Sequence, residues 1–278
     1  MRTTGEDGLP WAGGLRAGGR ALADLVLPRV CAGCARPGAV LCGPCRGLLA
    51  RPRLAEPRRH PPGFPPTVAA GAYAGPVRPT VLAFKEHGRA ELAAPLGTAL
   101  ALAVGAVLAG LPPPAGPVVL VPMPSAPSAV RRRGRDHVRE LAAHAVAELT
   151  AAGVAAMTVP LLGRAGRTRD SAGLDAAARR ANLAGRFRRL PLALPPGARL
   201  VLVDDVATSG ATLTEAARAL AAGAPSGDAA PVLAAVVAAT VRRVPRPVWG
   251  RSPATFTVRS HFGGDGWWSP VSGPGDHD

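Results

Sequence analysis

The segment 200–212 constrains the fold of this 278-residue chain more than any other part of the sequence. It begins as an apolar run typical of a buried strand, and the run ends in two adjacent carboxylates, Asp204 and Asp205. A small, hydroxyl-rich turn containing Gly210 follows, and a helical pattern then begins. A strand that leads through such a turn into a helix predicts one unit of an α/β sheet.

Apolar runs and helical spacings alternate along the middle of the chain. Strands are expected at 67–73, 117–121, 157–162, 199–204 and 232–241, and helices at 90–110, 135–152, 175–184 and 212–222. The strands are apolar on both faces, which is typical of parallel strands covered by helices on both sides. The fold class that follows is α/β, with a parallel sheet flanked by helices.

The turn at 207–212 has the features of a phosphate-binding loop. Backbone N–H groups at a helix N-terminus attract anions, and a glycine permits a positive φ or a close approach. The proposed ligand-binding residues are Ala207, Thr208, Ser209, Gly210, Ala211 and Thr212. Asp204 and Asp205 would repel phosphate and suit sugar hydroxyls or a Mg²⁺ ion beside a phosphate. The combination indicates a ribose 5-phosphate site; the alternative is a capped helix after an ordinary loop.

All four cysteines lie in one short stretch, Cys31-x2-Cys34-x7-Cys42-x2-Cys45. Two Cys-x2-Cys pairs this close together predict a structural, tetrahedral Zn²⁺ site. Two disulfides or a redox pair are the alternatives, and disulfides are disfavoured because we expect no secretory signal. We expect the metal to supply the folding energy of a module too small to bury a core.

The chain carries 33 basic and 18 acidic residues, a formal charge of +15, and Lys85 is its only lysine. Such a surplus indicates an anionic partner or a general preference for arginine, and the arginine clusters lack the interleaved aromatics that stack bases. The uncharged stretch 92–111 is long enough to cross a membrane, but it is rich in Ala and Gly and contains Pro95. We expect a buried core helix, no membrane span and a cytoplasmic protein.

Segment 201–212 resembles the signature of type I phosphoribosyltransferases. Together with the cysteine module, the whole of 20–241 is similar to the ComF family, the competence-protein F type of bacterial phosphoribosyltransferase-like proteins. Further landmarks occur in the expected order: Tyr73 with Gly75, Phe84-Lys85 with Gly88, Val121-Pro122-Met123-Pro124, Arg133-Gly134, Arg167-Thr168, and Arg180 and Asn182 with Phe187. The expected organisation is a leader with a short amphipathic helix (1–27), the zinc module (28–50), a Pro/Arg linker (51–66), a phosphoribosyltransferase-like domain (67–244) and a disordered tail (245–278).

The resemblance implies that the ligand is phosphoribosyl pyrophosphate. Asp204 and Asp205 would contact the ribose hydroxyls as the catalytic acids, the turn would hold the 5-phosphate, and Mg²⁺ would lie on the pyrophosphate side. The family's chemistry is displacement of pyrophosphate at the anomeric carbon through an oxocarbenium-like state, which depends on placed charges. Lys85 and Arg133 are further candidate ligand-binding residues, and 131–135 is expected either as a mobile basic loop or as a solvated helix start.

The chain departs from the family pattern at Arg135-Asp136-His137 and at Asp170-Ser171, where the acceptor or a flexible loop is expected. His137 is expected as a solvated histidine on a helix, with a general acid or base as the alternative. The functions left open are a phosphoribosyltransferase, a non-catalytic ligand sensor associated with single-stranded DNA and the DNA-uptake machinery, and a structural partner of a DNA-processing protein.

Overall fold

The computed structural model describes residues 29–57, 61–165, 185–223 and 231–240. The leader 1–27, the predicted helix 175–184 and the tail 245–278 lie outside the described residues, as do the landmarks Arg167-Thr168, Asp170-Ser171, Arg180 and Asn182. The helices are α2 (Gly43–Gly47), α3 (Val77–Lys85), the 3-10 turn η1 (Ala90–Leu92), α4 (Ala93–Leu108), α5 (Pro127–Arg133), α6 (His137–Ala151) and α8 (Ala211–Ala222). The strands are β1 (Arg53–Leu54), β2 (Thr67–Ala72), β3 (Val118–Pro122), β4 (Ala156–Thr158), β5 (Leu162–Arg164), β6 (Phe187–Arg189), β7 (Arg199–Ala207) and β8 (Leu233–Ala239).

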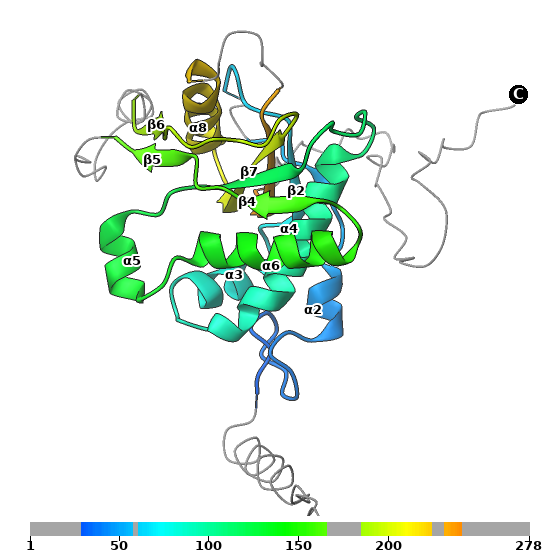
Figure 1. Ribbon diagram of the computed structural model, residues 1–278. Helices are drawn as coiled ribbons and strands as arrows, with labels where there is room; N and C mark the ends of the chain where they lie inside the picture. Colours follow the sequence, from blue (N-terminus) through cyan, green and yellow to red (C-terminus); the bar gives the residue numbers. More distant parts are fainter. Residues whose placement is uncertain (1–28, 58–60, 166–184, 224–230, 241–278) are drawn as a thin grey trace, which may run out of the picture.

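Six strands form one twisted sheet in the order β1-β2-β8-β7-β3-β4 (Figure 1). Every neighbouring pair is parallel except β1 and β2, which are antiparallel at one edge. The predicted α/β class is therefore confirmed, with a mixed, mostly parallel sheet. Because parallel strands place their carboxyl ends at one edge of the sheet, β7 and its neighbour β3 bring the segments that follow them to the same place.

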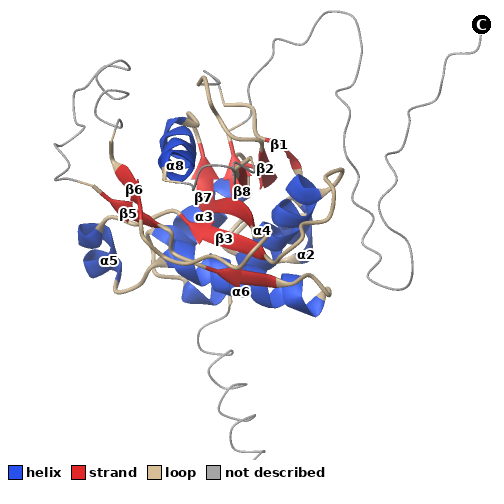
Figure 2. Ribbon diagram, turned by 45° about the horizontal axis from the view of Figure 1, so that its top comes forward, coloured by secondary structure: helices blue, strands red, loops and turns tan. Residues whose placement is uncertain are grey.

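Helices cover both faces of this sheet (Figure 2). On one face α3, α4 and α6 pack in a large apolar cluster together with the cysteine module, and on the other face α8 and the separate β5–β6 pair cover a second cluster. The helices α4 and α6 approach closely at Gly97, where an added Cβ would lie 2.2 Å from the Cβ of His144. The sheet is thus buried on both sides, as its apolar strands predict.

The span Ala90–Leu108, which covers η1 and α4, is long and apolar enough to cross a membrane by length and composition. Half of its most apolar window is buried inside the protein, and α4 packs against β2, β8 and α6. These contacts account for the apolar composition of α4 as part of the protein core.

Three parts of the chain differ from the sequence-based expectation. Helix α3 was not predicted, and β1 lies within the predicted Pro/Arg linker, where its position at the sheet edge tolerates neighbouring prolines. The single strand expected at 157–162 is two strands, β4 and β5, that belong to different sheets. Pro160 lies between them and cannot donate a ladder hydrogen bond, so the strand stops there.

Candidate functional site

The two adjacent acids of β7 have different environments. The strand continues past them to Ala207, so their side chains alternate between the two faces of the sheet. Asp205 is only 2% exposed, and its Oδ2 lies 2.7 Å from Lys85 Nζ and 3.1 Å from His137 Nε2. Its Oδ1 accepts the Val206 N–H at 2.8 Å. Asp205 is therefore held by the protein through both oxygens.

Asp204 is half-buried, and its Oδ1 accepts the Asp205 N–H at 2.8 Å. Among the described residues it makes no ion pair. Burial and the neighbouring negative charge of Asp205 raise the pKa of Asp204 well above its ordinary value. Burial disfavours ionisation of Asp205 too, but His137 and Lys85 outweigh it and leave the pKa of Asp205 below the ordinary range. The pair thus combines a firmly ionised acid with one that holds its proton to higher pH.

Lys85 and His137 come from two different helices on the same face of the sheet. Lys85 is the last residue of α3, and His137 is the first residue of α6, whose preceding Asp136 accepts the Arg139 N–H as the N-cap. Burial opposes the charge of Lys85, but the carboxylates of Asp205 and then Asp204 raise the pKa of the amine. The only lysine of the sequence therefore lies at the acid pair.

His137 is 4% exposed, so its expectation as a solvated residue is wrong. It lies at helical spacing with the buried Leu141 and Ala145, and this stripe is the sequence signal that could have placed it inside. Its Nδ1 is buried without a hydrogen-bond partner among the described residues, whereas Nε2 faces Asp205. A proton on Nε2 satisfies this geometry, because a second N–H on Nδ1 would be buried without an acceptor.

Arg133 and Arg135 are both engaged by acids. Arg133 Nη2 lies 2.7 Å from Glu86, directly after α3, and Arg135 pairs with Glu140 while its guanidinium lies 4.3 Å from the centre of the Phe84 ring. The segment 131–135 is accordingly neither a loop nor a helix start: its first three residues are the last turn of α5, which ends at Gly134 with φ 69°. These pairs link α5 and α6 to α3 beside the acid pair.

The β7–α8 turn presents backbone N–H groups that donate to no carbonyl of the described residues. Within the described residues, neither backbone nor side chain accepts a hydrogen bond from the amides of Thr208, Ser209, Gly210 or Thr212, and the Ala211 N–H makes only a 3.5 Å contact with the Ser209 hydroxyl. Gly210 caps α8 with φ 76°, so of the two roles expected for this glycine it has the positive φ. Thr208 and Ser209 are exposed. This is the arrangement of an anion-binding helix start.

The linker packs on the same turn. An added Cβ on Gly210 would lie 2.8 Å from the ring of Phe64 and 3.0 Å from Cγ of Pro57. Two parts of the linker, 55–57 and 61–66, thus support a turn that lies far from them in the sequence.

Gly210→Ala is therefore expected to lower the free energy of unfolding by about 2 kcal/mol, since a left-handed φ costs about 1 kcal/mol for alanine and the linker must also move. Denaturant unfolding measures this change. Gly105→Ala is a matched control, because that glycine lies in a helix with open space around it and has an ordinary φ. Equal stability of Gly210→Ala and wild type would contradict the packing of the linker on the turn.

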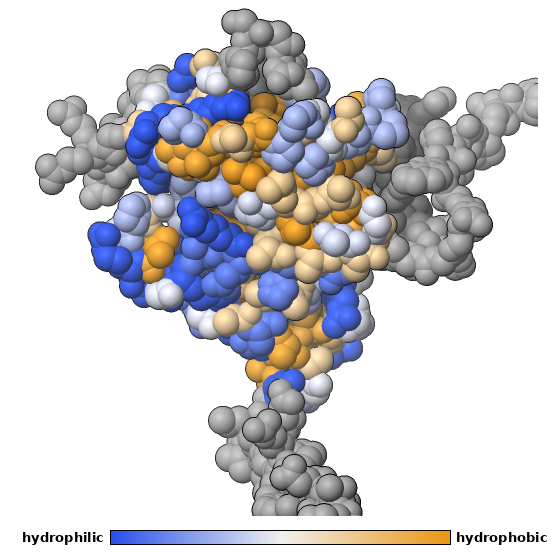
Figure 3. Space-filling view, viewed as in Figure 1, coloured by the Kyte–Doolittle hydropathy of each residue, from blue (hydrophilic) through white to orange (hydrophobic). Residues whose placement is uncertain are grey.

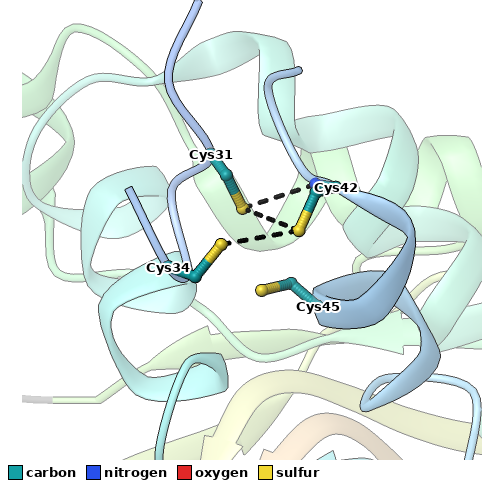
Figure 4. Close-up of side chains that lie close together, drawn as sticks. All are labelled: Cys31, Cys34, Cys42 and Cys45. Atoms are coloured by element: carbon teal, nitrogen blue, oxygen red, sulfur yellow. Dashed lines mark hydrogen bonds between the residues drawn. The ribbon is translucent and has the colours of Figure 1, made fainter. Parts of the chain in front are cut away.

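The four cysteines converge as the sequence predicts (Figure 4). All four Sγ atoms lie within 4.8 Å of one another, and the Cys31–Cys42 and Cys34–Cys42 sulfur separations are both 3.5 Å. A tetrahedron with Zn–S bonds of about 2.3 Å has sulfur separations of about 3.8 Å, so the cluster fits a structural zinc ion. None of the four is in a disulfide.

The thiols differ in their readiness to ionise. Burial opposes ionisation of Cys31, but N–H groups of Cys42, Cys34 and Gly33 outweigh it and lower its pKa to about 6. Burial raises the pKa of Cys45, and the neighbouring thiols add to the effect. A bound cation would remove this penalty, because thiolates are the form that ligates zinc.

The cysteine module shares a core with the sheet domain. Cys31, Cys45 and Leu49 are buried in the same apolar cluster as α3. At Gly33 an added Cβ would lie 2.9 Å from Cys45 Sγ and 3.0 Å from Thr80 Oγ1 of α3. The module therefore packs directly on the helix that ends in Lys85.

No protein-family model matches the chain, and no curated protein matches it. The fold and the cysteine cluster define the chain as an α/β protein with a four-cysteine cluster near its N-terminus.

Proposed function

We propose that this chain binds phosphoribosyl pyrophosphate with Mg²⁺ on a type I phosphoribosyltransferase-like sheet, in the manner of ComF-type proteins. The observation that carries the proposal is the β7–α8 turn, whose amides donate to no carbonyl of the described residues and open a helix beside the half-buried Asp204. Thr208 to Thr212 hold the 5-phosphate through backbone N–H groups and hydroxyls. Among the described residues only the cysteines form a cluster of three or more potential metal ligands, so Mg²⁺ is brought by the pyrophosphate.

In this proposal Asp204 and Asp205 have different roles. Asp204 contacts the ribose hydroxyls, since it is half-buried where Asp205 is buried, and it makes no ion pair among the described residues. Asp205 positions the strand end, because its oxygens are already occupied by Lys85, His137 and the Val206 amide. Loss of pyrophosphate builds positive charge on the ribose, and the fixed carboxylate of Asp205 stabilises that charge electrostatically.

Binding is tested by thermal unfolding with phosphoribosyl pyrophosphate and Mg²⁺. At a ligand concentration of about 100 times Kd, mass action stabilises the folded state by about 2.7 kcal/mol, which raises Tm by roughly 5–11 °C. Asp204→Asn is expected to remove most of this shift, while Glu148→Gln, an exposed position on α6, retains it. An unchanged wild-type Tm would contradict the ligand assignment. Pyrophosphate release is then measured with a range of candidate acceptors, which distinguishes an enzyme from a non-catalytic ligand sensor.

A role in DNA uptake or processing is a second proposal, and the exposed arginines of α5 favour it. Arg131 and Arg132 project from its last turn, and Figure 3 shows hydrophilic side chains gathered over α5 and the start of α6. Single-stranded DNA binding that weakens steeply with salt would support it. Absence of binding at low salt would contradict it.

A further inference from the structure

The imidazole of His137 is enclosed by the protein. Its side chain is 5% exposed, and its Nε2 lies 3.1 Å from Oδ2 of Asp205, an acid that is itself buried. The other ring nitrogen, Nδ1, is buried without a hydrogen-bond partner among the described residues, and the ring meets that of Phe84 edge-on. A ring enclosed in this way is not placed to exchange a proton with a substrate, so any role of His137 at the site is exerted through Asp205.

His137 and Lys85 contact the same oxygen of Asp205. Lys85 Nζ lies 2.7 Å from Oδ2, while Oδ1 accepts the Val206 N–H at 2.8 Å. Burial opposes the charge of Asp205, but the hydrogen bond from His137 and then the charge of Lys85 outweigh it and lower the pKa of the acid. Asp205 is therefore kept ionised and in place by His137 as well as by Lys85.

Lys85 is the member of this cluster that a ligand can reach. Its side chain is 32% exposed, compared with 3% for Asp205. An ammonium group has three N–H donors, so a donor directed at Asp205 leaves others for a second anion. The neighbouring Arg133 is less accessible, because its side chain is 12% exposed and lies 2.7 Å from Glu86.

The cluster lies at the edge of the sheet where parallel strands bind ligands. Val203 is in register with Pro122, the last residue of β3, so Asp205 lies beyond the end of that strand at the carboxyl edge. An anion that binds Lys85 there competes with Asp205 for the amine. A buried carboxylate that loses a donor is destabilised, and the hydrogen bond from His137 to the same oxygen reduces this cost.

We propose that His137 is a positioning residue, which holds the Asp205 carboxylate so that Lys85 can present its amine to the pyrophosphate group of the ligand. That this anion is pyrophosphate rests on the proposed function. His137 acts as an N–H donor and exchanges no proton with the substrate. A side chain that supplies an N–H at the same place should therefore replace it, whereas an apolar side chain should not.

The test measures the binding of magnesium pyrophosphate to the full chain by titration calorimetry at constant ionic strength. His137→Leu should weaken binding by about 10-fold, because Asp205 then depends on Lys85 and competes harder for its amine. Lys85→Met should weaken binding at least as much. Since both changes act through one amine, the double variant should bind within about 2-fold of Lys85→Met alone.

His137→Gln separates a positioning role from proton exchange, because its amide can donate to Asp205 but cannot act as a general acid or base. We expect it to bind within about 3-fold of wild type. Two matched controls should also bind like wild type. They are His144→Gln, at an exposed position on α6, and Arg78→Met, which removes an exposed positive charge from α3.

The Nε2–H proton of His137 gives a second measurement in the wild type, which serves if His137→Leu fails to fold. It is assigned by NMR as the imidazole N–H resonance that is absent from His137→Gln. Saturating magnesium pyrophosphate should shift this resonance, because its acceptor oxygen is shared with Lys85.

Four results would overturn the inference: no pyrophosphate binding by wild type, equal binding by His137→Leu, effects that multiply in the double variant, or an unshifted resonance. Phosphoribosyl pyrophosphate is titrated in parallel. If it does not bind while pyrophosphate gives the expected pattern, only the proposed function is rejected. If it binds wild type and His137→Leu equally, only the positioning role is rejected.

Discussion

Asp205→Asn is expected to destabilise the folded chain by about 3 kcal/mol, whereas the same change at the adjacent Asp204 is not. Removing the Asp205 charge leaves the Lys85 amine without the carboxylate that lies 2.7 Å from it. The pair is largely buried, because Asp205 is only 2% exposed. Breaking a buried pair on one side costs about 3–5 kcal/mol, and the partial exposure of Lys85 places the cost at the lower end. The expected fall in Tm is roughly 6–12 °C.

Asp204→Asn should have the opposite effect on the free protein. The pKa of Asp204 is raised by burial and by the charge of Asp205, so its ionised form is disfavoured in the folded state. Removing the charge should therefore leave stability unchanged or increase it, while ligand binding is lost. Asp204→Asn is for this reason the cleaner probe of the ligand, since the loss of binding in Asp205→Asn would be mixed with unfolding.

The pH dependence has opposite signs at the two positions. A lowered folded pKa stabilises above the ordinary aspartate value of about 3.9, so the difference between wild type and Asp205→Asn is full near neutral pH and vanishes as the pH falls through the folded pKa of Asp205. A raised pKa in the folded state has the opposite effect. The free energy of unfolding of Asp204→Asn therefore increases relative to that of wild type as the pH rises towards and through the folded pKa of Asp204. Urea unfolding between pH 3 and 8 measures both differences. Equal stability of the two variants at neutral pH would contradict the assigned roles.

The sheet was predictable because its strands are marked by uninterrupted apolar runs. The runs at 67–73, 117–121, 199–204 and 232–241 each correspond to a strand of the six-stranded sheet, and the helices expected at 90–110, 135–152 and 212–222 correspond to α4, α6 and α8. Helix α3 was missed although Val77, Val81 and Phe84 recur at helical spacing, because its nine residues are few for a helix and include Pro79; its packing on the cysteine module stabilises it. Tertiary contacts of this kind have no local sequence signal.

The sequence predicted the segments of the candidate site but not the contacts between them. The turn at 207–212 and the four cysteines stand out by residue type and spacing. The sequence could not show that Asp205 rather than Asp204 is the buried acid, because β7 is apolar on both faces: Val201 and Val203 share a face with Asp205, and the equally buried Leu202 shares one with Asp204. The contacts of Asp205 with Lys85 and His137 join positions 120 and 68 residues away, and only the packed fold brings them together.

We expect the four thiols to hold a zinc ion, and loss of one of these ligands is the second change with a large expected effect, which Cys34→Ser tests most directly. Cys34 is exposed, so its replacement by serine removes one ligand without disturbing the core packing of Cys31 and Cys45. Without zinc, serine at this position should be nearly neutral, as surface substitutions are. If the wild type holds zinc, we expect Cys34→Ser to lower the free energy of unfolding by about 3 kcal/mol or more and Tm by roughly 10 °C, because its remaining, partly ionised thiols are then held together without a cation.

Elemental analysis should give one zinc per wild-type chain and less in Cys34→Ser, and a strong chelator should reproduce the lower Tm until zinc is restored. The matched control is Ser128→Ala, another small change outside the core. The effect should also reach the ligand site, because Gly33 lies closely against both Cys45 and Thr80 of α3, and α3 ends in Lys85. A loosened α3 withdraws the amine from Asp205, so phosphoribosyl pyrophosphate should bind more weakly to the metal-free chain. A Cys34→Ser protein as stable as wild type would show that the four thiols hold the module together without a metal.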